Sequence, residues 1–246
     1  MNSTSGRPER EIDLQETAVY GPIDSRRLGR SLGINLLPAD CKYCVFDCVY
    51  CQYGVTKPGH EGGKIKKGPE LLAEIRKAFE HHRAQRTAID CLTIAGNGEP
   101  TVHPDFPAIV DGLRKLRDEF FPGVKIGILS NAAQVHRPEI RGALDKLDRR
   151  YMKLDAGTAE LVTQINRPHG AFDFDRMIDG LRALQSVVIQ SLFIQGRCDN
   201  TGAEDVERWI DQIAVIRPLE VHVYTIDRKP AEAGLERVET KQLREI

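Results

Sequence analysis

Four of the six cysteines in this chain lie close together, at Cys41, Cys44, Cys48 and Cys51. In a reducing compartment such a density indicates metal ligation more than disulfide bonds. The two C-x2-C pairs are separated by three residues, which is too close for a zinc ribbon, whose pairs usually stand about 15 to 20 residues apart. The order of the spacings also differs from the ferredoxin run C-x2-C-x2-C-x3-C. The pattern therefore favours a tight loop that wraps one iron-sulfur cubane.

The last three of these cysteines form the pattern C-x3-C-x2-C, and an aromatic residue, Tyr50, precedes the final one. This pattern resembles the signature of the radical S-adenosylmethionine (SAM) superfamily. The resemblance implies that Cys44, Cys48 and Cys51 hold three irons of a 4Fe-4S cluster, and that the fourth iron binds the amino and carboxylate groups of SAM. It also implies reductive cleavage of SAM to a 5'-deoxyadenosyl radical, which abstracts hydrogen from an unidentified substrate.

An alternative function uses all four clustered cysteines. With Cys41 as a fourth ligand the cluster would be closed, and the chain would be a non-catalytic electron-transfer or sensor protein. The other two cysteines lie apart from the cluster. Cys91 falls inside an apolar run, where a thiol packs as a small apolar group. Cys198 follows another apolar run, and either packs there or handles substrate.

The resemblance extends over residues 21–227 and, within the superfamily, to a subgroup that includes the wybutosine-synthesis tRNA enzymes. Its carrying stretches are residues 21–33, the cysteine loop, and residues 96–101. It implies tRNA as one candidate substrate, while a small molecule or a peptide stays open. It also implies an external one-electron donor of the flavodoxin or ferredoxin type.

The SAM-binding residues are expected after successive strands, where barrel enzymes collect their chemistry. By resemblance to the family's G-G-E stretch, Gly98 and Glu99 hold the methionyl amine of SAM, with Asn97 in place of the first glycine. The alternative for Glu99 is a loop cap. For Ser130 and Asn131 the alternative to a SAM contact is helix capping, and for Lys153 and Asp155 it is a surface ion pair between them. The predicted cofactor-binding set is Tyr50, Gly98, Glu99, Ser130, Asn131, Lys153 and Asp155.

Two further groups of polar residues are candidates for binding anions. Residues 166–169 and 195–197 carry suitable donors on the same side of the predicted fold. Basic residues before the first strand and after the cluster either form a phosphate-binding rim or belong to solvated loops. These basic residues are Arg26, Arg27, Arg30, Lys57, Lys64, Lys66 and Lys67.

Apolar runs and amphipathic segments alternate along the chain. The runs at residues 33–37, 90–95, 124–129, 151–155, 188–195 and 220–226 predict strands that are buried on both faces. Pro69, Pro104 and Pro138 mark helix starts between them. Such alternation predicts an α/β fold with a parallel sheet. Six units are too few for a closed eight-unit barrel, so a partial (βα)6 TIM-like barrel is expected, and the resemblance implies the radical SAM type.

The composition excludes several other classes. The 246 residues are 41% hydrophobic, with 35 Lys+Arg against 36 Asp+Glu and a net charge of −1. Disordered, collagenous and disulfide-framework proteins are excluded, and the balanced charge favours no polyanionic partner. No stretch approaches the roughly 18 to 20 apolar residues of a membrane span, so a cytoplasmic, soluble protein is expected. We expect an N-terminal arm at residues 1–20 and a core domain at residues 21–246.

The end of the chain leaves one question open. Thr240 is expected to cap a helix that covers the last strand, yet the sequence stops at Ile246. A helix that short does not cover a strand. Truncation of the core domain at its C-terminus is therefore an open alternative.

Overall fold

The computed structural model describes residues 12–25, 28–56, 64–227, 230 and 232–246. Within these residues one sheet has the order β1-β2-β3-β4-β5-β6-β7, and β8 pairs with β6. Strands β2 to β7 are parallel, whereas β1 and β8 run antiparallel to their neighbours. The strands are β1 (Val19–Ser25), β2 (Gly29–Ile34), β3 (Cys91–Ile94), β4 (Lys125–Ser130), β5 (Arg149–Lys153), β6 (Val187–Gly196), β7 (Glu220–Thr225) and β8 (Leu235–Arg237). The partial six-unit barrel is thereby confirmed.

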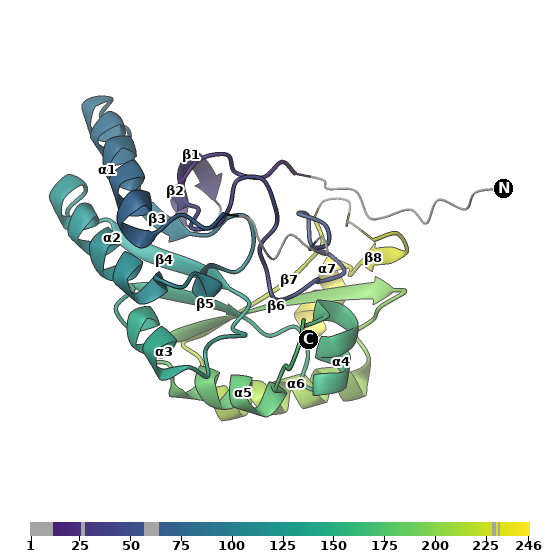
Figure 1. Cartoon of the computed structure of the whole chain (residues 1–246). Helices are drawn as coiled ribbons and strands as arrows, with labels where there is room; N and C mark the ends of the chain where they lie inside the picture. The colour runs from purple at the N-terminus through teal and green to yellow at the C-terminus, as the bar shows by residue number, and fades with distance from the viewer. Residues whose placement is uncertain (1–11, 26–27, 57–63, 228–229, 231) are drawn as a thin grey trace.

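Helices connect the parallel strands, and Figure 1 shows α1, α2, α3, α5 and α6 along one side of the curved sheet. The helices are α1 (Gly68–Ala84), the 3-10 turn η2 (Pro100–Val102), α2 (Phe106–Phe120), α3 (Pro138–Leu144), α4 (Ala159–Asn166), α5 (Phe174–Ala183), α6 (Ala203–Ile216) and α7 (Thr240–Glu245). Pro69 and Pro138 lie in first turns as predicted, while Pro104 lies just before α2 and Pro107 is in its first turn. Thr240 begins α7, and the N-cap is Glu239, so the predicted cap is off by one residue.

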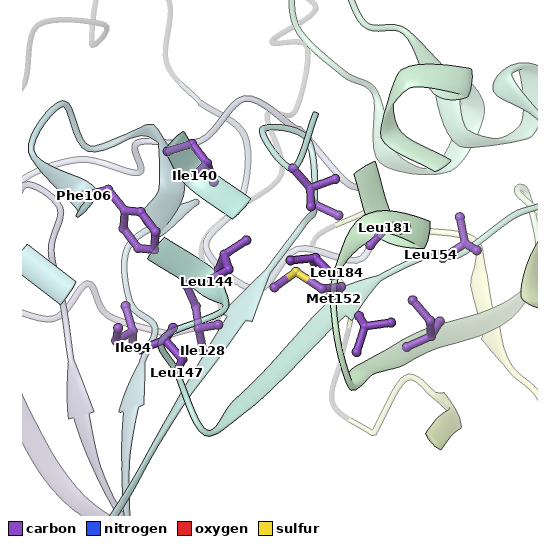
Figure 2. Close-up of a cluster of buried hydrophobic side chains, with 14 of the residues drawn as sticks. Ile94, Phe106, Ile128, Ile140, Leu144, Leu147, Met152, Leu154, Leu181 and Leu184 are labelled. Atoms are coloured by element: carbon purple, nitrogen blue, oxygen red, sulfur yellow. The ribbon is translucent and has the colours of Figure 1, made fainter. Parts of the chain in front are cut away.

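The apolar core lies between the sheet and these helices. Figure 2 shows Ile94, Ile128 and Met152, from three neighbouring strands, near leucines of the helices and loops. All three are fully buried. Parallel strands covered in this way read as continuous apolar runs, which is why the sequence revealed β3, β4 and β6. Strand β7 is partly exposed along its length, so the prediction of burial on both faces is wrong for it. The core fixes the carboxyl ends of these strands, where the predicted site residues lie.

The first strands depart most from the sequence prediction. Strand β2 covers Gly29–Ile34, so it begins earlier than the predicted run at residues 33–37 and ends before Leu36 and Leu37. Strand β1 was not predicted, because its sequence VYGPIDS shows neither an apolar run nor clean alternation. It pairs with β2 at the edge of the sheet.

The described part of the N-terminal arm packs on the core domain. Leu14 and Ala18 are buried. The side-chain amide of Asn97 pairs with the main chain of Gln15, accepting from its N–H at 2.7 Å and donating to its carbonyl oxygen at 2.9 Å. Among the described residues, no helix combines the length and the apolar character needed to cross a membrane.

Candidate functional site

The cysteine loop, residues 41–51, begins beside the carboxyl end of β3. The N–H of Tyr43 donates to Asn97 O at 2.7 Å, and the N–H of Glu99 donates to Tyr43 O at 3.1 Å. Gly98 lies between these contacts with φ of +147°, and a Cβ there would lie 1.8 Å from Tyr43 O. Only glycine permits so close an approach. This pairing places Cys44 beside Gly98 and Glu99.

The other half of the loop pairs with the segment that follows α4. The hydrogen bonds run from Val49 N to Ile165 O at 2.9 Å, from Asp47 N to Arg167 O at 3.1 Å, and from His169 N to Val45 O at 2.8 Å. The loop is thus held between two segments that are far apart in the sequence. Three residues of the predicted anion-binding stretch 166–169 contact the cysteine loop: Arg167 and His169 through the main chain, and Asn166 through its side chain.

A buried ion pair that the sequence analysis missed fills the loop. Lys42 Nζ lies 2.7 Å from Asp47 Oδ1 and donates to Gly54 O at 2.8 Å. Burial alone would lower the pKa of Lys42, but Cys51, Cys44 and Asp47 raise it overall. Burial would raise the pKa of Asp47, and its hydrogen bonds with Lys42 and Thr56 lower it. The ion pair stabilises the interior of the loop. The sequence signal that could have predicted it is the presence of two opposite charges, Lys42 and Asp47, five positions apart.

Two of the three predicted ligand thiols accept hydrogen bonds from carboxamides. Asn131 Nδ2 lies 3.6 Å from Cys44 Sγ, and Asn166 Nδ2 lies 3.3 Å from Cys48 Sγ. Burial raises the pKa of Cys48 to about 11 and that of Cys44 further. A metal must displace these protons when it binds.

The donor set fits a cluster better than a single ion. Within the described ranges, no three His, Cys, Asp or Glu side chains converge as one metal ion requires. A 4Fe-4S cluster places each cysteine on a different iron, so its ligands stand apart. Cys44, Cys48 and Cys51 are partly accessible, whereas Cys41 is buried.

Glu99 is a buried carboxylate, 2% exposed, that is held only by neutral donors. Its Oε1 accepts from Thr101 N at 3.0 Å, Thr101 Oγ1 at 2.6 Å and Ser130 Oγ at 2.8 Å. Its Oε2 accepts from Asn131 N at 2.6 Å. Burial raises the pKa of Glu99, and these hydrogen bonds oppose that shift. In the described part of the chain, no basic side chain forms an ion pair with it.

The residues after β4 both support Glu99 and cap their own turn. Ser130 Oγ accepts from Ala132 N at 3.1 Å, and Asn131 Oδ1 accepts from Ala133 N at 2.9 Å. Glu99 itself caps η2 through Thr101 N. The cap alternative is therefore present for Glu99, whereas Ser130 and Asn131 close a turn and the N-cap of α3 is Arg137. Their contacts with SAM stay predictions.

Lys153 and Asp155 form an ion pair that is largely buried, so the alternative of a surface ion pair is wrong. Lys153 Nζ lies 2.8 Å from Asp155 Oδ1 and donates to the Tyr224 hydroxyl at 2.8 Å. The Tyr50 hydroxyl donates to Asp155, and Asn166 Nδ2 donates to Asp155 Oδ2 at 2.7 Å. Burial would lower the pKa of Lys153, but Asp155 and Tyr224 raise it. Burial, followed by Asp155, raises the pKa of Tyr50.

Among the described basic residues, Arg30 lies apart from Lys66. Arg30 pairs with Asp90 at 3.3 Å, at the amino ends of β2 and β3. Lys66 pairs with Glu74 at 2.6 Å, near the start of α1. These two lie at different ends of the sheet because β2 runs from one to the other. Arg26, Arg27 and Lys57 fall outside the described residues.

The remaining candidates have structural contacts. Arg167 forms an ion pair with Glu232, and Arg197 N donates to Gly234 O at 2.8 Å, beside the pairing of β6 with β8. Cys91 is buried in β3, as predicted for packing. Cys198 is partly exposed, and its Sγ lies 4.0 Å from Gln164 O.

Comparison with known families agrees with this geometry. The model of the radical SAM superfamily matches residues 41–207, from the cysteine loop into α6. The chain belongs to the radical SAM superfamily. Members of this superfamily use a 4Fe-4S cluster and SAM. The expected cofactors are therefore those of the family.

Several relatives of this radical SAM chain are curated proteins. A "UPF0026 protein" from Helicobacter pylori is 31% identical over 215 residues, which are 85% of this chain and 66% of that protein. A "UPF0026 protein" from Synechocystis is 30% identical over 89% of this chain and 79% of its own length. A more distant relative, "S-adenosyl-L-methionine-dependent tRNA 4-demethylwyosine synthase" from Arabidopsis thaliana, is 26% identical over 49% of this chain and 17% of its own length. The chain thus spans about two thirds of the first of these relatives.

Solved radical SAM structures share the fold. The structure of TYW1 with a lysine-pyruvate adduct bound aligns with a TM-score of 0.59 at 12% identity, over 88% of this chain and 71% of TYW1. A radical SAM methyltransferase from Sphaerobacter thermophilus aligns with a TM-score of 0.61 at 16% identity, over 87% of this chain and 61% of that one. Identities this low establish a common fold.

Proposed function

We propose that this chain is a radical SAM enzyme in which Cys44, Cys48 and Cys51 ligate a 4Fe-4S cluster. When bound, the cluster and SAM supply a 5'-deoxyadenosyl radical for hydrogen abstraction from a substrate. One observation carries the proposal. The cysteine loop pairs with the chain at Gly98, which sets Cys44 near the buried carboxylate of Glu99.

The protein's own residues bind SAM and orient it. Glu99 accepts hydrogen bonds from the ammonium group of SAM, because its negative charge has no basic partner in the described part of the chain. Ser130 and Asn131 hold that carboxylate in place. Tyr50, Lys153 and Asp155, which are joined to one another by hydrogen bonds and an ion pair, supply further contacts for SAM. An external one-electron donor of the flavodoxin or ferredoxin type delivers the electron.

Anaerobic reconstitution with iron and sulfide, followed by an assay for 5'-deoxyadenosine, tests the proposal. The parent protein is expected to show the brown 4Fe-4S absorbance and to cleave SAM when dithionite is added. Replacing Cys44, Cys48 or Cys51 with Ala is expected to abolish the absorbance. The matched controls Cys91→Ser and Cys198→Ser are expected to retain it.

Cys41→Ser separates the enzyme from the four-cysteine electron carrier. The enzyme proposal expects this variant to keep both the cluster and SAM cleavage. Loss of the cluster in Cys41→Ser, together with a parent protein that neither binds nor cleaves SAM, would replace the enzyme with a closed iron-sulfur site.

For the substrate we propose tRNA as the first candidate to test. The tRNA 4-demethylwyosine synthase relative, which aligns with 49% of this chain, supports it. Lys64 and Lys66 lie near the start of α1, beyond the carboxyl end of β2, where they can meet phosphates.

Binding of tRNA between about 50 and 200 mM salt provides the test. Counterion release gives slopes of roughly −0.7 to −0.9 per phosphate contact, and replacing Lys64, Lys66 and Lys67 with Ala is expected to flatten the slope. The control Arg30→Ala, at the other end of the sheet, is expected to change nothing. Absence of binding at low salt would favour a small molecule or a peptide instead.

A further inference from the structure

Cys44 and Cys48, two of the three proposed ligands, accept hydrogen bonds from different donors. Cys48 Sγ faces Asn166 Nδ2 at 3.3 Å, and Cys44 Sγ faces Asn131 Nδ2 at 3.6 Å. Cys44 Sγ also lies 3.5 Å from the main-chain N of Phe46. The contact at Cys48 is the shortest of the three. It also joins the cysteine loop to a residue that lies 118 positions later in the sequence.

Asn166 is held in an orientation in which one N–H of its carboxamide donates to Asp155 and the other faces Cys48 Sγ and the Tyr50 hydroxyl oxygen. It is 3% exposed. Its Nδ2 lies 2.7 Å from Asp155 Oδ2 and 3.2 Å from the Tyr50 hydroxyl oxygen, in addition to Cys48 Sγ. A flipped carboxamide would turn its oxygen toward a carboxylate and a sulfur, so these neighbours determine the assignment of N and O. Asp155 is itself fixed by Lys153 at 2.8 Å.

Hydrogen bonds to the sulfur ligands are among the factors that set the potential of an iron-sulfur cluster. An N–H directed at a thiolate stabilises the electron-rich, reduced form more than the oxidised form. We propose that Asn166 is a positioning residue that raises the reduction potential of the cluster through its hydrogen bond to Cys48. The inference rests on the proposed function, because it needs a cluster on Cys48.

The test is a redox titration of the reconstituted cluster in the absence of SAM, in which electron paramagnetic resonance measures the reduced cluster at each potential. In Asn166→Ala we expect a more negative potential. At a fixed solution potential, the ratio of reduced to oxidised cluster is expected to fall by roughly threefold to tenfold, the range of one hydrogen bond. If this variant takes up no iron, Asn166→Leu is measured in its place, since it keeps the side-chain volume without the N–H.

Asn200→Ala is the matched control. Asn200 is also a buried asparagine beside Asp155, and it donates to Asp155 O at 2.7 Å and to Leu192 O at 2.8 Å, not to a thiol. It is expected to leave the potential unchanged. An unchanged potential in the Asn166 variants, or an equal fall in Asn200→Ala, would overturn the inference.

Two other outcomes are distinct from these. Loss of iron from both Asn166 variants, with retention in Asn200→Ala, would also overturn the inference and assign Asn166 to holding the loop. A parent protein that forms no 4Fe-4S cluster would instead overturn the proposed function.

Discussion

Glu99 and Asp155 are buried carboxylates that follow parallel strands and contact different ends of the cysteine loop, yet their surroundings differ. Asp155 is 1% exposed and has Lys153 at 2.8 Å. Glu99 is 2% exposed and is held by hydroxyl and main-chain N–H donors. Burial of a charge is costly unless the charge is paired. The comparison shows that the charge of Asp155 is paired within the protein, whereas the described residues give Glu99 neutral donors alone, which is the basis for the proposal that it binds a cation.

The largest expected effect follows from breaking the ion pair between Lys153 and Asp155. Asp155→Asn leaves Lys153 as a buried charge without its carboxylate, and we expect a loss of about 3 to 5 kcal/mol in the free energy of unfolding. Denaturant unfolding of the metal-free protein measures it. The double variant Lys153→Met, Asp155→Asn is expected to recover much of the loss. If the single and double variants are equally unstable, Lys153 and Asp155 do not depend on each other.

Glu99→Gln is expected to affect SAM more than it affects the fold. A neutral amide loses the charge-assisted hydrogen bond to the ammonium group, which contributes roughly 1.5 to 3 kcal/mol, or about 10- to 150-fold in affinity. Anaerobic titration of SAM into the cluster-loaded protein measures this, with cluster absorbance retained. The exposed Glu119, paired with Arg76 at 2.6 Å, supplies the control Glu119→Gln. Equal affinities in parent and Glu99→Gln would remove Glu99 from the site.

The smallest expected effect is a pH dependence that reports the unpaired charge of Glu99. Burial raises its pKa above the ordinary value of 4.5. At low pH the group is protonated in both the folded and the unfolded state. As pH rises above 4.5, the unfolded state releases its proton first, so the folded state loses stability relative to it. The stability of the metal-free parent, measured against that of Glu99→Gln, should therefore fall as pH rises. If the parent instead gains stability relative to Glu99→Gln as pH rises, a positively charged group already pairs with Glu99 in the folded protein.

The sheet was predictable where its strands are covered on both faces. The runs at 90–95, 124–129 and 188–195 became β3, β4 and β6 because buried parallel strands are apolar throughout. Strands β1 and β8 lack that signature. Each lies antiparallel to a single partner, and only the pairing, which the local pattern does not encode, makes them strands.

The sequence by itself determined the superfamily and supplied the prediction of the cluster ligands. The spacing of Cys44, Cys48 and Cys51 and the glycine before Glu99 are local features, because one loop and one turn supply them. These features were sufficient to place the chain in the radical SAM superfamily, which the family model then confirmed.

Only the tertiary structure decided the electrostatic surroundings of that chemistry. It buried Lys153 with Asp155 instead of leaving them at the surface, and it separated Arg30 from Lys66. It also brought Asn166 to Cys48. The physical reason is that ligand spacing depends on a few adjacent residues, whereas burial and charge compensation depend on groups brought together from distant segments.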